Sequence, residues 1–167
     1  IRPAVESALM AAEVILDVAR KKKCDLVVAN DVSEPGSGFA VDTNRVTLVD
    51  SSGWIEYLAN RPKAGRFATF LEGREPLLIS AMEIYEVYKV IRRDLSEERA
   101  VEAVSALRRA TIAAVDETLA LEAADLSLAH GLAMADSLVY ATARRFGATL
   151  VTGDSDFEGL PDAIVVS

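Results

Sequence analysis

Short apolar runs alternate with longer helix-forming stretches from residue 46 to the end of this chain, and this alternation limits the fold more than any other feature. The apolar runs predict strands at 46–50, 77–80, 110–115, 148–152 and 163–166. Runs such as Leu48-Val49 and Ile164-Val165-Val166 are apolar at consecutive positions, which is typical of parallel strands covered by helices on both faces. The pattern predicts an α/β domain with three α/β/α layers around a central parallel sheet of five strands.

The intervening stretches carry helix start and stop signals. Ser96 is an expected N-cap of a helix that runs to about residue 109, because its hydroxyl can accept from a free backbone N–H. Gly131 and Gly147 follow helices predicted at 117–129 and 134–146, and glycine is favoured just past a helix end. These signals predict where the helices begin and end.

Four acidic residues lie where different elements can bring them together: Asp50 and Asp154 end apolar runs, Glu86 lies on the helix after such a run, and Asp136 opens a helix. Functional groups gather at the carboxyl ends of strands in an open parallel sheet, so we expect the four carboxylates to meet there. Clustered carboxylates raise each other's pKa, and a divalent cation with oxygen ligands relieves this repulsion. The sequence therefore predicts a metal-dependent enzyme that holds Mg²⁺ or Mn²⁺ on these four residues.

Neighbouring polar residues offer additional or alternative roles. Ser52 could orient Asp50 through a hydroxyl hydrogen bond, although Ser51 or Ser52 could instead cap the following helix. Glu83 and Glu86 lie three residues apart and share one side of a predicted helix. We favour Glu86 as the metal ligand and keep Glu83 as the alternative.

The other two acidic segments are also ambiguous when taken singly. Asp136 lies in an otherwise apolar stretch, where an acidic residue could simply favour the helix N-terminus. Asp154 and Asp156 lie two residues apart after a strand, and we expect Asp154 to be the ligand with Asp156 assisting it. His130 precedes Gly131 at a helix end, where a packed histidine is ordinary.

Composition limits the class of protein. The net charge of −8 argues against a broad electrostatic grip on nucleic acid, which needs a basic surface. No apolar stretch approaches the roughly 20 residues of a membrane span. Cys24 is the single cysteine, so an internal disulfide is excluded and a reducing, cytoplasmic location is expected.

Taken together, the acidic segments resemble the PIN-domain ribonucleases, and most closely their VapC-type toxins, over about residues 47–167. The matching motifs are Asp50-Ser51-Ser52, Ser80 to Glu86, Asp136-Ser137-Leu138 and Thr152-Gly153-Asp154-Ser155-Asp156-Phe157. Glu83 departs from the family, whose members more often have a neutral polar residue there. The resemblance implies metal-dependent cleavage of single-stranded or looped RNA, an antitoxin protein as partner, and a homodimer. It also gives Thr152 a supporting role beside the acids.

Residues 1–46 contain the motifs KKCDLVVANDV, from Lys22 to Val32, and GFAVDTNRV, from Gly38 to Val46. These motifs resemble the end of a different protein, phosphopantothenate–cysteine ligase. A helix is expected at 3–23 and a strand at 25–29, followed by a loop. Because the nucleotide-binding body of that enzyme is absent, we interpret this segment as a helix–strand extension that is a fusion remnant, a gene-boundary artefact or a structural cap. A nucleotide-related role is the alternative. The expected organisation is an extension at 1–46 and a nuclease domain at 47–167.

Two other functions fit a cluster of acidic residues. A receiver-type phosphoacceptor domain also holds Mg²⁺ on aspartates at strand ends, but it needs a lysine after a late strand, and no lysine follows Lys89. A non-catalytic interaction module would use the acids as helix caps. Metal titration distinguishes this module from an enzyme.

Overall fold

The computed structural model describes residues 46–167, so the helix and strand predicted within residues 1–45 lie outside the described part of the chain. The five predicted strands are present as β1 (Thr47–Val49), β2 (Leu77–Ser80), β3 (Thr111–Ala113), β4 (Thr149–Thr152) and β5 (Ala163–Val165). They form one sheet in the order β3-β2-β1-β4-β5. Each neighbouring pair is parallel, which confirms the predicted sheet.

The order of the strands reverses at the centre of the sheet. The chain proceeds outward from β1 to β2 and β3, then returns to place β4 on the other side of β1. Leu48 of β1 pairs with Leu78 of β2 and with Leu150 of β4. The carboxyl ends of β1 and β4 are therefore adjacent, at the position where α/β sheets bind ligands.

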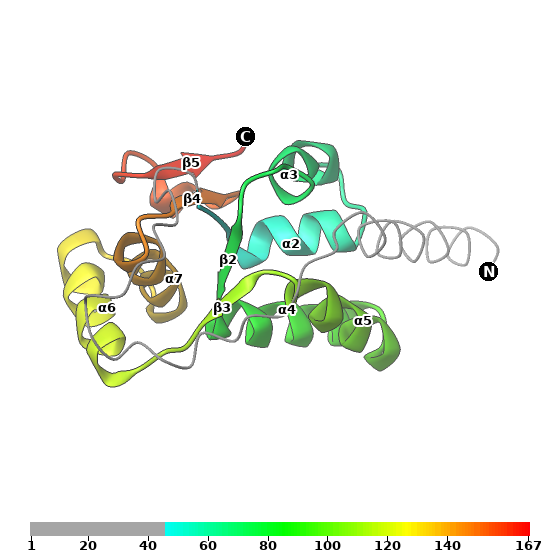
Figure 1. The fold of residues 1–167 in the computed structure, drawn as a ribbon, viewed down its shortest axis with the longest axis horizontal. Coiled ribbons are helices and arrows are strands. Elements are labelled where there is room, and N and C mark those ends of the chain that lie inside the picture. Colours follow the sequence, from blue (N-terminus) through cyan, green and yellow to red (C-terminus); the bar gives the residue numbers. More distant parts are fainter. Residues whose placement is uncertain (1–45) are drawn as a thin grey trace.

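Within residues 46–167, six α-helices cover the two faces of the sheet: α2 (Ser51–Leu58), α3 (Ala64–Leu71), α4 (Ala81–Asp94), α5 (Glu97–Leu107), α6 (Glu117–His130) and α7 (Met134–Arg145). A 3-10 helix, η2 (Ser155–Phe157), follows β4. Helices α2 to α5 lie on one side of the sheet and α6 and α7 on the other (Figure 1). The predicted α/β/α layering is confirmed.

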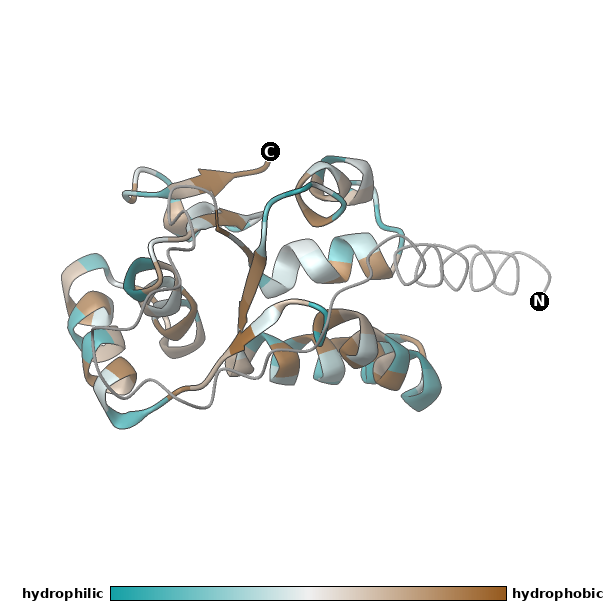
Figure 2. Cartoon of the chain, viewed as in Figure 1, coloured by the Kyte–Doolittle hydropathy of each residue, from teal (hydrophilic) through white to brown (hydrophobic). Residues whose placement is uncertain are grey.

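Side chains alternate between the two faces along each central strand. Val49, Ile79 and Val151 are fully buried in the core formed with α2 to α5, whereas Leu48 and Leu150 are buried in the core formed with α7. This period of two follows from strand geometry. The central strands are accordingly hydrophobic where they lie between the two helix layers (Figure 2).

Helix limits agree with the predicted start and stop signals to within about two residues. The Ser96 hydroxyl accepts from the backbone N–H of Arg99 at 3.2 Å, and Gly131 adopts a left-handed conformation with φ of 73° at the end of α6. Helix α4 continues to Asp94 and ends before Leu95. No helix within residues 46–167 is long and apolar enough to cross a membrane.

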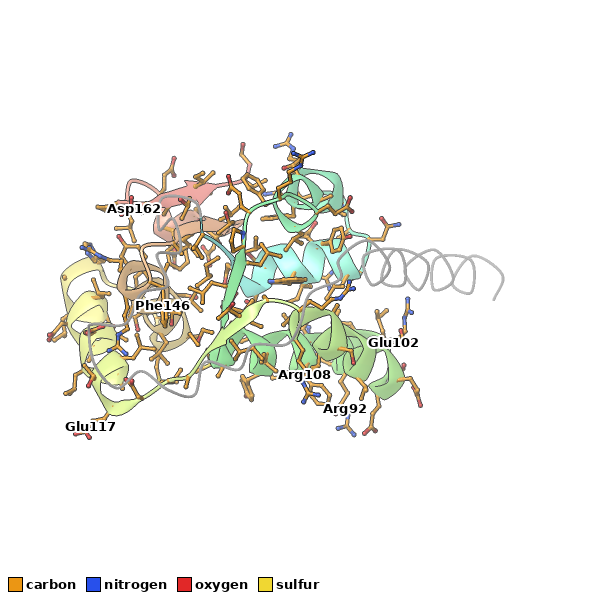
Figure 3. All side chains as sticks on the ribbon, in the orientation of Figure 1. Arg92, Glu102, Arg108, Glu117, Phe146 and Asp162 are labelled. Carbon is orange, nitrogen blue, oxygen red and sulfur yellow. The ribbon has the colours of Figure 1, made fainter. Side chains whose placement is uncertain are left out.

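Charged side chains lie on the outside of this frame. Arg92, Glu102 and Arg108 project from the outer surface of α4 and α5 (Figure 3). Arg92 pairs with Glu97 at 2.9 Å, and both side chains are more than half exposed. These arginines are solvated helix surface, which is the simplest interpretation of adjacent basic residues.

Candidate active site at the carboxyl ends of the strands

Asp50 occupies the turn between β1 and α2. Its Oδ1 accepts from the backbone N–H of Ser51 at 2.7 Å, so Asp50 itself is the N-cap of α2. The predicted alternative, in which Ser51 or Ser52 caps this helix, is therefore wrong. Asp50 is only 5% exposed, and a buried carboxylate needs such hydrogen bonds to offset its desolvation.

Two hydroxyls hold the second oxygen of Asp50. The Ser52 Oγ donates to Oδ2 at 2.7 Å, as expected from the sequence, and the Thr152 Oγ1 donates to the same atom at 2.8 Å. Three hydrogen bonds occupy most of the roughly four acceptor positions of a carboxylate. Asp50 is therefore held in one orientation.

The same hydroxyls also join β1 to β4. Ser52 Oγ accepts from the backbone N–H of Gly153 at 3.0 Å, and Thr152 Oγ1 accepts from that of Asp154 at 3.0 Å. Each hydroxyl thus donates to Asp50 and accepts from the turn after β4. This arrangement fixes the position of Asp154 relative to Asp50.

The structure brings three aspartates into one small group. Asp136, Asp154 and Asp156 each offer a carboxylate oxygen, and these oxygens all lie within 4.8 Å of one another. Asp136 comes from the first turn of α7. Asp154 Oδ1 accepts from the backbone N–H of Asp156 at 2.9 Å, so Asp154 is the N-cap of the 3-10 helix.

Asp50 and Glu86 lie outside this group of three but act on it electrostatically. Burial is the main cause that raises the pKa of Asp136 to about 6, and the charges of Asp50, Asp154, Glu86 and Asp156 raise it further. Like charges this close disfavour the ionised form. All the acids predicted from the strand ends therefore share one region of negative potential.

Glu86 borders this region from α4. It is half-buried, and burial raises its pKa, while a hydrogen bond from the Ser51 side chain lowers it. Asp50 raises it and Lys89 lowers it through their charges. The contact with Ser51 was not anticipated, since nothing in the local sequence links the start of α2 to α4.

Glu83 has a different environment one turn earlier. Its Oε2 accepts from the backbone N–H of Ser80 at 2.5 Å and completes a capping box with the Ser80 hydroxyl. Glu83 is fully buried, and its Oε1 has no hydrogen-bond partner among residues 46–167. Desolvation raises the pKa of Glu83 well above its ordinary value. The Ser80-x-x-Glu83 spacing is a capping-box signature that can be recognised in a sequence.

His130 lies apart from these acids. Its ring meets the Tyr140 ring edge-on, with centroids 6.1 Å apart. This contact agrees with the packed role expected of a histidine at a helix end.

The fold and the acidic cluster define a class: a parallel α/β domain with carboxylates gathered where the strand order reverses. The sequence model of the PIN domain matches residues 47–162. This chain belongs to the PIN domain family, as its motifs indicated.

Solved structures with the same fold are VapC toxins and their complexes. A toxin–antitoxin complex from Klebsiella pneumoniae superposes with a TM-score of 0.61 and 22% identity, covering 71% of this chain and 96% of that one. VapC20 of Mycobacterium tuberculosis, a toxin that cleaves the sarcin–ricin loop, gives 0.57 and 18%, covering 68% and 91%. DNA-bound VapBC from Salmonella typhimurium gives 0.57 and 19%, covering 73% and 96%. At these identities the likeness establishes the fold.

Two further similarities each cover only part of the chain. The model of the DNA/pantothenate metabolism flavoprotein C-terminal domain matches residues 4–71, in agreement with the ligase resemblance. A cysteine/cysteine sulfinic acid decarboxylase from an unknown prokaryotic organism is 40% identical over 37 residues, 22% of this chain. The chain spans about 10% of the length of that relative.

Proposed function

We propose that this protein is a divalent-metal-dependent endoribonuclease, the toxin of a toxin–antitoxin pair. The observation that supports this best is the group of Asp136, Asp154 and Asp156, whose oxygens lie within 4.8 Å of one another in a PIN domain. Mutual repulsion of this kind is unfavourable unless a cation neutralises it. An all-oxygen donor set suits Mg²⁺ or Mn²⁺.

The ligands in this proposal are Asp50, Glu86, Asp136 and Asp154, with Asp156 assisting. A cation bound there would lower the pKa of a bound water and neutralise charge on the phosphate oxygens. Ser52 and Thr152 act as positioning residues, because each donates to Asp50 and so directs its remaining acceptor position. Such outer-shell hydrogen bonds commonly control metal affinity.

Glu86, and not Glu83, is the acid we assign to the site from α4. Glu86 is half-buried and hydrogen-bonded by Ser51, so it remains accessible from the cluster. Glu83 is fully buried, and one of its oxygens caps α4. A ligand that must exchange with water fits the position of Glu86 better.

The substrate and partners are proposed from the relatives. One similar toxin is named for cleaving the sarcin–ricin loop, and others are complexes with antitoxins. We propose that this chain likewise cleaves single-stranded or looped RNA in the cytoplasm, forms a homodimer and is inhibited by an antitoxin.

The division of the chain at residue 46 is also part of the proposal. The match to the flavoprotein domain runs to residue 71 and so overlaps β1, α2 and α3. However, Trp54, Phe67 and Leu71 from this overlap are buried in the same core as Ile79 and Val151, which lie beyond it. This packing supports the assignment of residues 47–71 to the nuclease domain.

The receiver alternative has little support from the topology. Receiver domains have the strand order 2-1-3-4-5, whereas the order here is β3-β2-β1-β4-β5. A non-catalytic module remains the second hypothesis, since Asp50 and Asp116 do cap helices. It predicts no stabilisation by Mn²⁺, whereas a metal site stabilises the folded state by mass action.

An RNA-cleavage assay tests the proposal. The full chain is incubated with a structured RNA and Mn²⁺ or Mg²⁺, with EDTA as one control and Asp50→Asn as another. Asp125→Asn, which changes an exposed acid on α6, is the matched variant. We expect cleavage by the parent and Asp125→Asn only; full activity of Asp50→Asn or in EDTA would refute the metal-dependent mechanism.

A further inference from the structure

Tyr85 is a large aromatic side chain on α4, and 59% of it is exposed. It directly precedes Glu86 on α4, whereas the core-facing side of this helix carries Glu83, Val87 and Ile91. An exposed ring forgoes the stabilisation that burial of an aromatic side chain gives. Because it is exposed and next to Glu86 in the chain, Tyr85 is a candidate for substrate binding.

Lys89 lies against this ring, one helical turn further along. Its Nζ is 5.0 Å from the centroid of the Tyr85 ring, a cation–π distance. Within residues 46–167 Lys89 forms no ion pair, whereas Arg92, one turn further along the same helix, is paired with Glu97. The Lys89 ammonium is therefore free to bind an anion.

The pair also adjoins Glu86. Residues three apart on a helix are neighbours on its surface, and the positive charge of Lys89 lowers the pKa of Glu86. An aromatic face and a free cation thus lie next to the carboxylates at the carboxyl ends of the strands. The overall charge of −8 makes such a local cation important for any polyanion.

We propose that Tyr85 and Lys89 bind the RNA substrate beside the acidic cluster, Tyr85 by stacking on an unpaired base and Lys89 by binding the adjacent phosphate. Unpaired bases stack on exposed aromatic rings, and phosphates pair with basic side chains. The inference rests on the proposed ribonuclease function and adds to it the residues that hold the substrate.

RNA binding is measured separately from cleavage. All proteins carry Asp50→Asn, and a fluorescently labelled single-stranded oligoribonucleotide is titrated in EDTA while its anisotropy is followed. Tyr85→Ala should weaken binding by about tenfold, and Tyr85→Phe should bind like the parent because the ring remains. Lys89→Gln should lower the slope of log Kd against log salt by about 0.7, because one phosphate contact on a single strand is lost.

Two variants control for charge and for exposed apolar area. Arg92→Gln removes one positive charge one turn beyond Lys89 on the same helix, where the arginine already pairs with Glu97. Leu128→Ala truncates a side chain that is 87% exposed on α6. Both should bind RNA like the parent, and thermal unfolding should show that all variants are folded.

The outcomes distinguish a wrong assignment of Tyr85 and Lys89 from a wrong ribonuclease function. If the parent cleaves RNA but Tyr85→Ala and Lys89→Gln bind it as tightly and with the same salt slope, the assignment of these residues is wrong and the ribonuclease function stands. If the chain neither binds nor cleaves RNA, both are overturned. Weaker binding by Leu128→Ala equal to that of Tyr85→Ala would also refute a specific stacking site.

Discussion

Replacing Asp136 with asparagine should stabilise the metal-free protein at neutral pH. Burial and four neighbouring carboxylates raise the pKa of Asp136 from 3.8 to about 6, so the folded protein binds this proton more tightly than the unfolded chain. The contribution of Asp136 to stability therefore falls as pH rises between about 4 and 6 and stays at its lowest above that range. The Asn side chain lacks the charge that causes this loss.

The magnitude follows from the shift. Each tenfold change in proton affinity corresponds to about 1.4 kcal/mol, which gives about 3 kcal/mol as an upper limit. Because Asp136 is partly exposed, solvent screening reduces this to about 1–2 kcal/mol. For a chain of this size the melting temperature should rise by roughly 2–8 °C.

The assay is thermal unfolding of parent and Asp136→Asn in EDTA at pH 4 and pH 7. We expect the variant to be more stable at pH 7 and indistinguishable from the parent at pH 4. Asp125→Asn, on an exposed part of α6, should match the parent within about 0.5 kcal/mol at both values. Mn²⁺ should stabilise the parent and not Asp136→Asn. A variant that is equally or less stable than the parent at pH 7 would refute the mutual repulsion.

Ser52→Ala and Thr152→Val each remove a hydroxyl that donates to Asp50, so we expect Mn²⁺ affinity to fall roughly 10- to 100-fold. Calorimetric titration measures this affinity, and an unchanged value in both variants would contradict their positioning role. Gly53→Ala would place a Cβ 2.6 Å from Cδ1 of the buried Phe67, so the free energy of unfolding measured in urea should fall by about 1–3 kcal/mol. Parent-like stability would mean that the core relaxes around the added methyl group. Glu83→Gln keeps an acceptor for the helix cap and removes a buried charge, so RNA cleavage should persist and stability at pH 7 should not fall; loss of cleavage would instead make Glu83 a ligand.

Much of the frame could be predicted from local patterns. Runs of consecutive apolar residues identified all five strands, and Ser96 and Gly131 marked helix limits, because these signals depend on contacts between residues close in the chain. The position of Asp50 and Asp154 after strands was equally readable. The role of each aspartate was ambiguous when its segment was taken singly, since an aspartate at a helix start is as often a cap as a metal ligand.

Contacts between distant segments could not be predicted in this way. The hydroxyl of Thr152 bonds to Asp50 across 102 residues, and Ser51 bonds to Glu86 on another helix. The spacing of Ser80 and Glu83 marks Glu83 as a helix cap, but only packing makes Glu83 fully buried and leaves Glu86 half-buried. Such differences depend on how helices pack on the sheet, which local propensity does not determine.

The sequence by itself determined that this chain forms a parallel α/β domain with acids at the strand ends. The spacing of its hydrophobic residues determines which segments are helices and which are strands, and consecutive apolar residues show that the strands are buried on both faces. Only the tertiary structure decided the strand order that places β4 beside β1. That long-range pairing converts acids distant along the chain into one cluster, since their mutual distances depend on which strands are neighbours and not on spacing along the sequence.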